Sequence, residues 1–221
     1  MYSQGTTEAK LISIVQRLNI VRGSALEIGA GDGIQDSNTR WFYEHEWDCR
    51  FIEADRSKYR LLVGNVNPTK CMRARVGLEA GCTLDELTTV AGCPEDLTLL
   101  SLDIDGNDYW VWRSTVKYVP TIVCVEYNSN FQPDERRTIA YDPEFVWRGG
   151  PYYGASAGAL VTLGNAKGYT LVDYDDGLNL LFVLERVRPP SLPQLLVERI
   201  PYKPMNAGRA ENRLMMEAPT I

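Results

Sequence analysis

Apolar residues recur along this chain in two different spacings, which alternate over most of its length. Residues 7–18 place their apolar side chains on one side of a helix, which predicts an amphipathic helix. Residues 97–102 and 121–125 are instead nearly continuous apolar runs, which are typical of parallel strands buried on both faces. The alternation of the two spacings predicts an α/β fold.

The same reasoning assigns the remaining elements. Helices are predicted at residues 7–18, 37–46, 56–65, from 83 onward, 108–116 and 156–167. Strands are predicted at residues 24–28, 49–52, 71–76, 97–102, 121–125, 169–173 and 178–184. Asp175-Asp176-Gly177 joins the last two strands as a hairpin signal. We therefore expect a mostly parallel seven-stranded sheet with an antiparallel last strand and helices on both faces.

Two segments do not follow this pattern. Residues 129–154 are rich in proline, glycine and aromatic residues, and a loop this long in a compact domain usually has a function. From Arg188 onward, prolines punctuate the chain and charges mix with isolated apolar residues. We interpret residues 1–187 as one domain and residues 188–221 as a proline-rich tail. The tail would wrap the domain, pack on a second copy of the chain in a homo-oligomer, or be partly disordered.

Composition narrows the range of partners. The chain has 221 residues and a formal net charge of −6, which argues against nucleic-acid binding because such proteins usually present a basic face. No apolar run approaches the length that crosses a membrane, and the first residues lack the pattern of a signal peptide. Five cysteines without a CxxC pair favour a reducing, cytoplasmic location, and the single histidine, His45, disfavours a zinc site.

A glycine-rich turn follows the first predicted strand. Glu27-Ile28-Gly29-Ala30-Gly31-Asp32-Gly33 places three glycines within five positions, and Glu53 ends the second predicted strand. Glycine permits a tight turn and the close approach of a ligand to the backbone. An acidic residue at the end of the second strand can accept hydrogen bonds from both ribose hydroxyls. Strand, glycine turn, helix and acid-ended strand together describe a nucleotide-binding unit.

This turn matches in full the E/D-x-G-x-G-x-G motif of class I S-adenosylmethionine-dependent methyltransferases, and the chain resembles that family over residues 26–183. The strings at 101–109 and 125–128, and Gly31-Asp32-Gly33 followed by Ser37-Asn38-Thr39, resemble its FkbM-type branch. The resemblance implies a Rossmann-like methyltransferase fold with S-adenosylmethionine as cofactor. It implies that Glu53 binds the ribose. The implied contacts at the methionine end are Glu27, Gly29, Ala30, Gly31 and Gly33, with Asp103 also at the cofactor.

Acidic and amide residues follow the predicted strands at the edge where open α/β sheets bind ligands. Asp103 and Asp105 are candidate catalytic residues, as a base or as metal ligands. The arrangement is similar to metal-dependent catechol-type O-methyltransferases, which implies that Asp103, Glu126 and Asn128 hold Mg²⁺ or Mn²⁺. One residue is inserted between Glu126 and Asn128 relative to that pattern. Alternatively, residues 105–108 are a turn and the cap of the next helix.

The loop at 129–154 would cover the acceptor in this fold. Candidate substrate contacts are Asn107, Tyr127, Arg148, Tyr152 and Tyr153, because aromatic rings can stack on a sugar and arginine can pair with an anion. Alternatively, the aromatics pack the loop onto the sheet.

The expected reaction is methyl transfer from S-adenosylmethionine to a hydroxyl of a small molecule or sugar. Two alternatives remain open. The chain would cleave or cyclise S-adenosylmethionine without an acceptor, or it would be a non-catalytic binding member of the fold.

Overall fold

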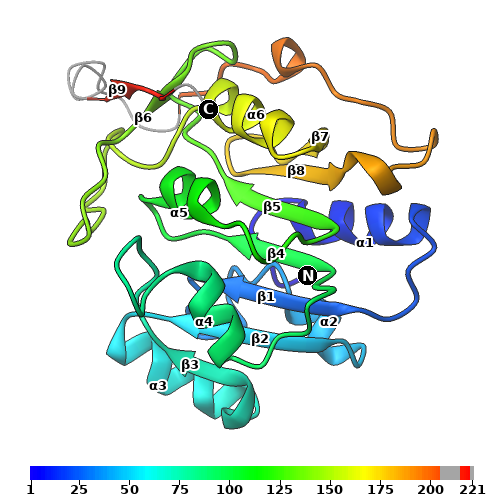
Figure 1. The fold of residues 1–221 in the computed structure, drawn as a ribbon, viewed down its shortest axis with the longest axis vertical. Helices are drawn as coiled ribbons and strands as arrows, with labels where there is room; N and C mark the ends of the chain where they lie inside the picture. Colours follow the sequence, from blue (N-terminus) through cyan, green and yellow to red (C-terminus); the bar gives the residue numbers. More distant parts are fainter. Residues whose placement is uncertain (205–214, 220–221) are drawn as a thin grey trace.

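A computed structural model describes residues 1–204 and 215–219 of the chain and has a seven-stranded sheet at its centre. The strand order is β3-β2-β1-β4-β5-β8-β7, as Figure 1 shows. Among the described strands of this sheet, β8 alone runs in the direction opposite to the other six. The strands are β1 (Ser24–Ile28), β2 (Asp48–Glu53), β3 (Cys71–Arg73), β4 (Leu99–Leu102), β5 (Ile122–Glu126), β7 (Tyr169–Tyr174) and β8 (Asn179–Leu184). The expected mostly parallel sheet with an antiparallel last strand is confirmed.

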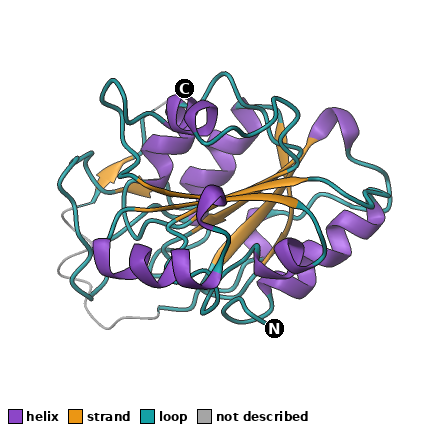
Figure 2. Cartoon of the chain, turned by 90° about the horizontal axis from the view of Figure 1, so that it is seen from below, coloured by secondary structure: helices purple, strands orange, loops and turns teal. Residues whose placement is uncertain are grey.

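Helices cover both faces of the sheet, as expected (Figure 2). One core lies between the sheet and α4, α5 and α6, and the other lies between the sheet and α1, α2 and α3. Alternate residues of a strand enter alternate cores: Leu26 and Ile28 enter the first, and Ala25 enters the second. The helices are α1 (Thr7–Arg17), α2 (Arg40–Glu44), α3 (Arg56–Asn65), α4 (Leu84–Val90), α5 (Asp108–Ser114) and α6 (Ala157–Ala166).

Two elements differ from their predicted ranges by three residues at one end. Helix α2 begins at Arg40 instead of residue 37, because residues 37–39 bind a buried carboxylate instead of continuing the helix. Strand β3 ends at Arg73 instead of residue 76, because its partner strand β2 ends opposite it at Glu53. The start of α4 agrees with the prediction: Thr83 caps the helix and exchanges hydrogen bonds with Glu86.

The remaining segments pack onto this framework. Strand β6 (Arg137–Thr138) lies in the long loop and pairs with β9 (Met216–Glu217) near the end of the chain. Leu192 and Ile200 are buried, so the tail lies against the domain at these two residues. Short 3-10 helices occur at η1 (Pro68–Lys70), η2 (Glu185–Val187) and η3 (Val197–Arg199).

The predicted tail includes residues 205–214 and 220–221, which lie outside the described residues. Within the described part of the chain, every helix is too short or too polar to span a membrane.

Candidate functional site

Two adjoining cavities lie beyond the carboxyl ends of the parallel strands, where open α/β sheets bind ligands. The β2-side cavity has a volume of about 450 Å³ and contains Glu53 and residues 74–76. The β5-side cavity has a volume of about 560 Å³ and contains Glu126 and Tyr153. Both volumes are in the usual range for small-molecule sites. The residues that line both cavities are Gly29, Lys58, Asp103, Asp105 and Trp147.

The glycine turn after β1 separates the sheet from these cavities. Gly29 has a φ of +81°, and a Cβ there would lie 1.7 Å from the carbonyl oxygen of Asp103. Gly31 has a φ of +57°, but a Cβ there would meet nothing within 4 Å. Gly29 is therefore required by packing against β4, whereas Gly31 leaves open space in the wall of the β5-side cavity. This open space is a cradle that a ligand can occupy.

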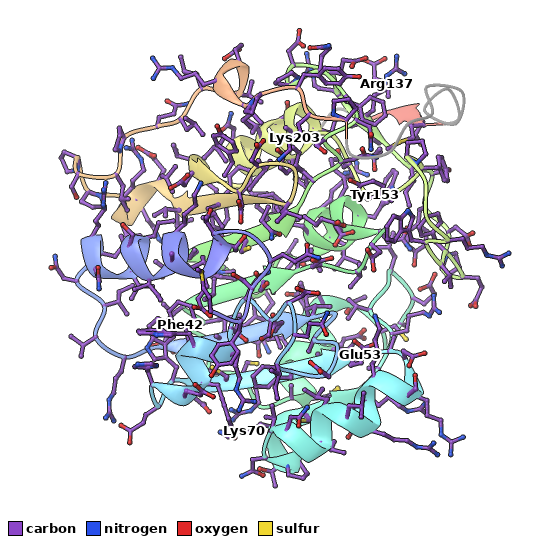
Figure 3. The ribbon with its side chains drawn as sticks, turned by 180° about the vertical axis from the view of Figure 1, so that it is seen from behind. Phe42, Glu53, Lys70, Arg137, Tyr153 and Lys203 are labelled. Carbon is purple, nitrogen blue, oxygen red and sulfur yellow. The ribbon has the colours of Figure 1, made fainter. Side chains whose placement is uncertain are left out.

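Glu53 ends β2 beside this turn and is 5% exposed (labelled in Figure 3). One carboxylate oxygen accepts a hydrogen bond from the amide of Gly31 at 2.8 Å, and the other accepts one from Asp55 at 2.6 Å. Each carboxylate oxygen can accept a second bond. Glu53 therefore fixes the glycine turn and keeps acceptor capacity toward the β2-side cavity, which it lines.

Glu27 has a different environment from the one expected. Its buried carboxylate accepts hydrogen bonds from the Ser37 hydroxyl at 2.7 Å, the Asn38 amide at 2.6 Å and the Thr39 hydroxyl at 2.8 Å. Burial raises the pKa of Glu27, and these hydrogen bonds oppose that rise. Glu27 is not among the residues that line either cavity. It holds the turn that places Asn38 in the wall of the β5-side cavity.

Three carboxylates converge where the two cavities meet. Oxygen atoms of Asp103, Asp105 and Glu126 lie within 4.8 Å of one another. One oxygen of Glu126, Oε2, is buried and has no hydrogen-bond partner among the described residues. Asp105 has a φ of +57°, a strained conformation for a residue other than glycine, and such strain is concentrated at functional sites.

The pKa values of these carboxyl groups are raised. For Asp103 the main cause is burial, followed by the negative charges of Asp108 and Asp105. For Glu126 the main cause is again burial, followed by the charges of Asp103, Asp108 and Asp105. Burial also raises the pKa of Asp105, and the positive charge of Lys58 opposes that rise. Each of these carboxyl groups therefore holds its proton more tightly than a carboxyl group in water does.

Asp108 is the fourth member of the acidic cluster, but backbone amides already bind its carboxylate. Its two oxygens accept hydrogen bonds from the amides of Ile104 and Gly106, both at 2.9 Å. Burial raises its pKa to about 7, although these amide bonds act in the opposite direction. The interpretation of this stretch as a turn therefore applies to Asp108, while Asp105 faces both cavities.

The loop after β5 contributes an aromatic wall. Trp147 lines both cavities, Tyr153 lines the β5-side cavity, and their ring centroids are 5.6 Å apart. Tyr153 is 5% exposed, and its place among the elements is labelled in Figure 3. Burial raises the pKa of Tyr153, with a further contribution from the charge of Glu126.

The other predicted site residues mostly hold the loop in place. Asn128 donates hydrogen bonds to the carbonyl oxygens of Pro151 and Tyr153, both at 2.8 Å, so the structure does not bring its side chain to the carboxylates. Asn107 lines the β2-side cavity and donates to the carbonyl of Asp142 at 2.7 Å. The hydroxyl of buried Tyr127 accepts a bond from the amide of Gly177 at 2.9 Å.

Three predicted substrate residues line neither cavity: Tyr127, described above, Arg148 and Tyr152. Arg148 is exposed, and Tyr152 packs against Phe145 in a small apolar cluster.

Lys58 and Asn179 are among the residues that line the cavities but were not predicted from the sequence. Lys58, in the first turn of α3, lines both cavities and provides positive charge beside Asp105. Residues 74–76 line the β2-side cavity because they follow directly after the edge strand β3. Asn179 lines the β5-side cavity opposite Glu126 in the strand pair, and its Oδ1 atom has no partner among the described residues.

The sheet order, the single antiparallel strand and the position of the glycine turn define the Rossmann-like methyltransferase fold. Solved structures agree with this. The N-terminal domain of EvdMO1, solved with S-adenosylhomocysteine bound, has a TM-score of 0.50 and 9% identity, covering 82% of this chain and 81% of that chain. A Listeria monocytogenes protein assigned as an S-adenosylmethionine-dependent methyltransferase has a TM-score of 0.50 and 8% identity. The match covers 81% of this chain and 97% of that chain. No protein-family model matches the chain, and no curated protein matches its sequence.

Proposed function

We propose that this protein transfers a methyl group from S-adenosylmethionine. The observation that carries the proposal is the cradle at Gly31, beside the Glu53 carboxylate and open to the three carboxylates. The space at Gly31 would accept the methionine end of the cofactor. Glu53 would accept hydrogen bonds from the ribose, and residues 74–76 would border the adenine. The bound cofactor would supply an electrophilic methyl group at the junction of the two cavities.

The protein's own residues would orient the acceptor and remove its proton. We propose a hydroxyl of a small molecule or sugar, bound in the β5-side cavity against Tyr153 and Trp147. As the oxygen–methyl bond forms and the sulfur–methyl bond breaks, the hydroxyl proton would pass to Asp103 or Asp105. The raised pKa of each carboxyl group makes it a better proton acceptor near neutral pH.

Calorimetry with S-adenosylhomocysteine tests the first step. We expect saturable binding by the unsubstituted chain and an affinity at least about tenfold lower for Glu53→Ala, because a buried ribose contact is worth about 1.4 kcal/mol or more. Glu198→Ala removes an exposed carboxylate outside both cavities and is the matched control. No binding by the unsubstituted chain at millimolar ligand would refute the proposal. Methylthioadenosine formed from S-adenosylmethionine alone would favour cleavage without an acceptor.

A divalent cation would fit the three carboxylates. Magnesium and manganese favour oxygen ligands, and the buried Glu126 Oε2 atom lacks a partner among the described residues. We propose that Asp103, Asp105 and Glu126, instead of the set that included Asn128, would hold Mg²⁺ or Mn²⁺. With the ion bound, Asp103 and Asp105 would be ligands instead of proton acceptors. The ion would lower the pKa of an acceptor hydroxyl, whose proton would pass to solvent.

The dependence of protein stability on pH tests the raised pKa values of the carboxyl groups in the acidic cluster. Because folding raises the pKa values of these carboxyl groups, the native state binds their protons more tightly than the unfolded chain does. Their contribution to the free energy of unfolding is fully present below about pH 4, which is their ordinary pKa. It is lost as the pH rises through their pKa values in the native state, about 7 for Asp108.

Between pH 5 and pH 8 we therefore expect the melting temperature to fall, and the fall to be smaller in Glu126→Gln. At pH 8, MgCl₂ should raise the melting temperature of the unsubstituted chain by mass action, but not that of Glu126→Gln. Glu198→Gln should behave like the unsubstituted chain. Parallel pH curves for all three proteins would contradict the prediction for the carboxylates, and equal responses to MgCl₂ would contradict the cation site.

A further inference from the structure

Residues 215–219 lie along the loop formed by residues 129–154 and are joined to it by backbone pairing. Strand β9 pairs with β6 inside the loop, as Figure 1 shows at one end of the molecule. The amide of Ala218 donates a further bond to the carbonyl of Arg136 at 3.0 Å. Beyond this point, the hydroxyl of Tyr109 in α5 donates to the carbonyl of Pro219 at 3.1 Å. The segment therefore connects the loop to the helix that follows the acidic cluster.

Met215 anchors this segment through its side chain. It is 3% exposed and forms a small apolar cluster with Phe131 and Ile139, against which Phe145 and Tyr152 also pack. All of its partners in this cluster belong to the loop. The cluster is separate from the two cores on the faces of the sheet. A change at Met215 can therefore loosen the loop without unfolding the domain.

The Met215 cluster is connected to both cavities. Phe145 lines the β2-side cavity. The amide group of Asn128 contacts the Met215 sulfur at 3.8 Å and donates to the carbonyl of Tyr153, which lines the β5-side cavity. The other side of the loop is tied to the sheet edge, because Arg75 donates to the carbonyl of Pro143 at 3.0 Å. The loop is thus fastened on both sides of the cavities that it borders.

We propose that residues 215–219 are a latch that holds the 129–154 loop over both cavities and limits the rate of cofactor exchange. The second half of this statement rests on the proposed function. The loop supplies Phe145, Val146 and Trp147 to the wall of the β2-side cavity, so a bound cofactor would lie against this wall. Movement of this wall would speed release of the cofactor, and burial of Met215 opposes that movement.

Two adjacent methionines provide a matched test. Met215 is 3% exposed and Met216 is 39% exposed, so the same substitution by aspartate disrupts the cluster at one position and not at the other. We expect Met215→Asp to increase hydrogen exchange across residues 129–154 in the free protein, and Met216→Asp to leave it within about twofold. S-adenosylhomocysteine should dissociate about tenfold faster from Met215→Asp in stopped-flow tryptophan fluorescence. Burying a methionine side chain stabilises the closed loop by at least the free energy that corresponds to a tenfold change. Met215→Leu should preserve both properties.

The outcomes separate the latch from the proposed function. Equal hydrogen exchange in Met215→Asp and Met216→Asp would overturn the latch, whether or not cofactor binds. Increased exchange with unchanged dissociation would overturn its role in cofactor exchange. Failure of the unsubstituted chain to bind S-adenosylhomocysteine would overturn the proposed function and the exchange role with it, while the hydrogen-exchange comparison would still decide whether residues 215–219 hold the loop.

Discussion

Replacing Gly31 by leucine is expected to abolish S-adenosylhomocysteine binding while leaving a folded protein. A Cβ at this position meets no atom within 4 Å, and Gly31 lines the β5-side cavity, so a leucine side chain would extend into that cavity. The backbone cost is limited to a residue with positive φ, about 1–2 kcal/mol. Calorimetry should show an affinity reduced at least about a hundredfold, because the substituted side chain occupies the space that the cofactor needs.

Gly92 is the matched control for this substitution. It has a φ of +70°, equally open surroundings and a position outside both cavities. Gly92→Leu should lose a similar free energy of unfolding and keep its affinity for S-adenosylhomocysteine within about threefold. Equal loss of binding in the two variants would mean that strain, and not occupation of the cradle, causes the effect. Unchanged binding in Gly31→Leu would remove the cradle from the proposed cofactor site.

Glu27→Leu is expected to destabilise the protein by about 3 kcal/mol. The substitution leaves the hydroxyls of Ser37 and Thr39 and the amide of Asn38 without their acceptor, and unsatisfied buried donors cost about 1–3 kcal/mol each. The two hydroxyls can rotate toward other acceptors, so the expected destabilisation is smaller than the sum of the three separate costs. Thermal unfolding should shift downward by about 10 °C for a domain of this size.

Glu27→Gln separates a structural role from direct contact with the cofactor. Glutamine keeps one oxygen for the Asn38 amide and can donate to the two hydroxyl oxygens, so we expect a loss of only about 1 kcal/mol. Affinity for S-adenosylhomocysteine should stay within about threefold. If Glu27 instead held the cofactor's charged amino group, this substitution would weaken binding strongly while the fold remained stable.

The sheet and its order of elements were predictable because they depend on local patterns. Continuous apolar runs such as β4 and β5 are interpretable residue by residue, and Asp175-Asp176-Gly177 marks the hairpin that makes β8 antiparallel. The glycine turn was predictable for the same reason, since Gly29 and Gly31 both have positive φ. The meeting of Asp103 and Glu126 followed from the rule that the ends of neighbouring parallel strands share one edge.

The contacts made by individual polar side chains were not predictable in this way. Glu27 binds residues about ten positions further along the chain, and only the folded turn reveals that its oxygens are already occupied. Asn128 lies two residues beyond Glu126, but its amide turns into the loop because two carbonyl oxygens there need a donor. The pairing of β9 with β6 joins segments about 80 residues apart, and two-residue strands leave no periodic signal.

The separate packing of the loop cluster also bears on how such a protein can change over generations. Phe131, Ile139 and Met215 share no core with the strands that carry the glycine turn. Substitutions, insertions or recombination within residues 129–154 can therefore accumulate with little effect on the strands that carry the glycine turn. The two segments must then change together, because a new loop must still pack against the distant segment at 215–219. Directed evolution toward new acceptors should accordingly diversify these two segments together and leave residues 24–53 unchanged.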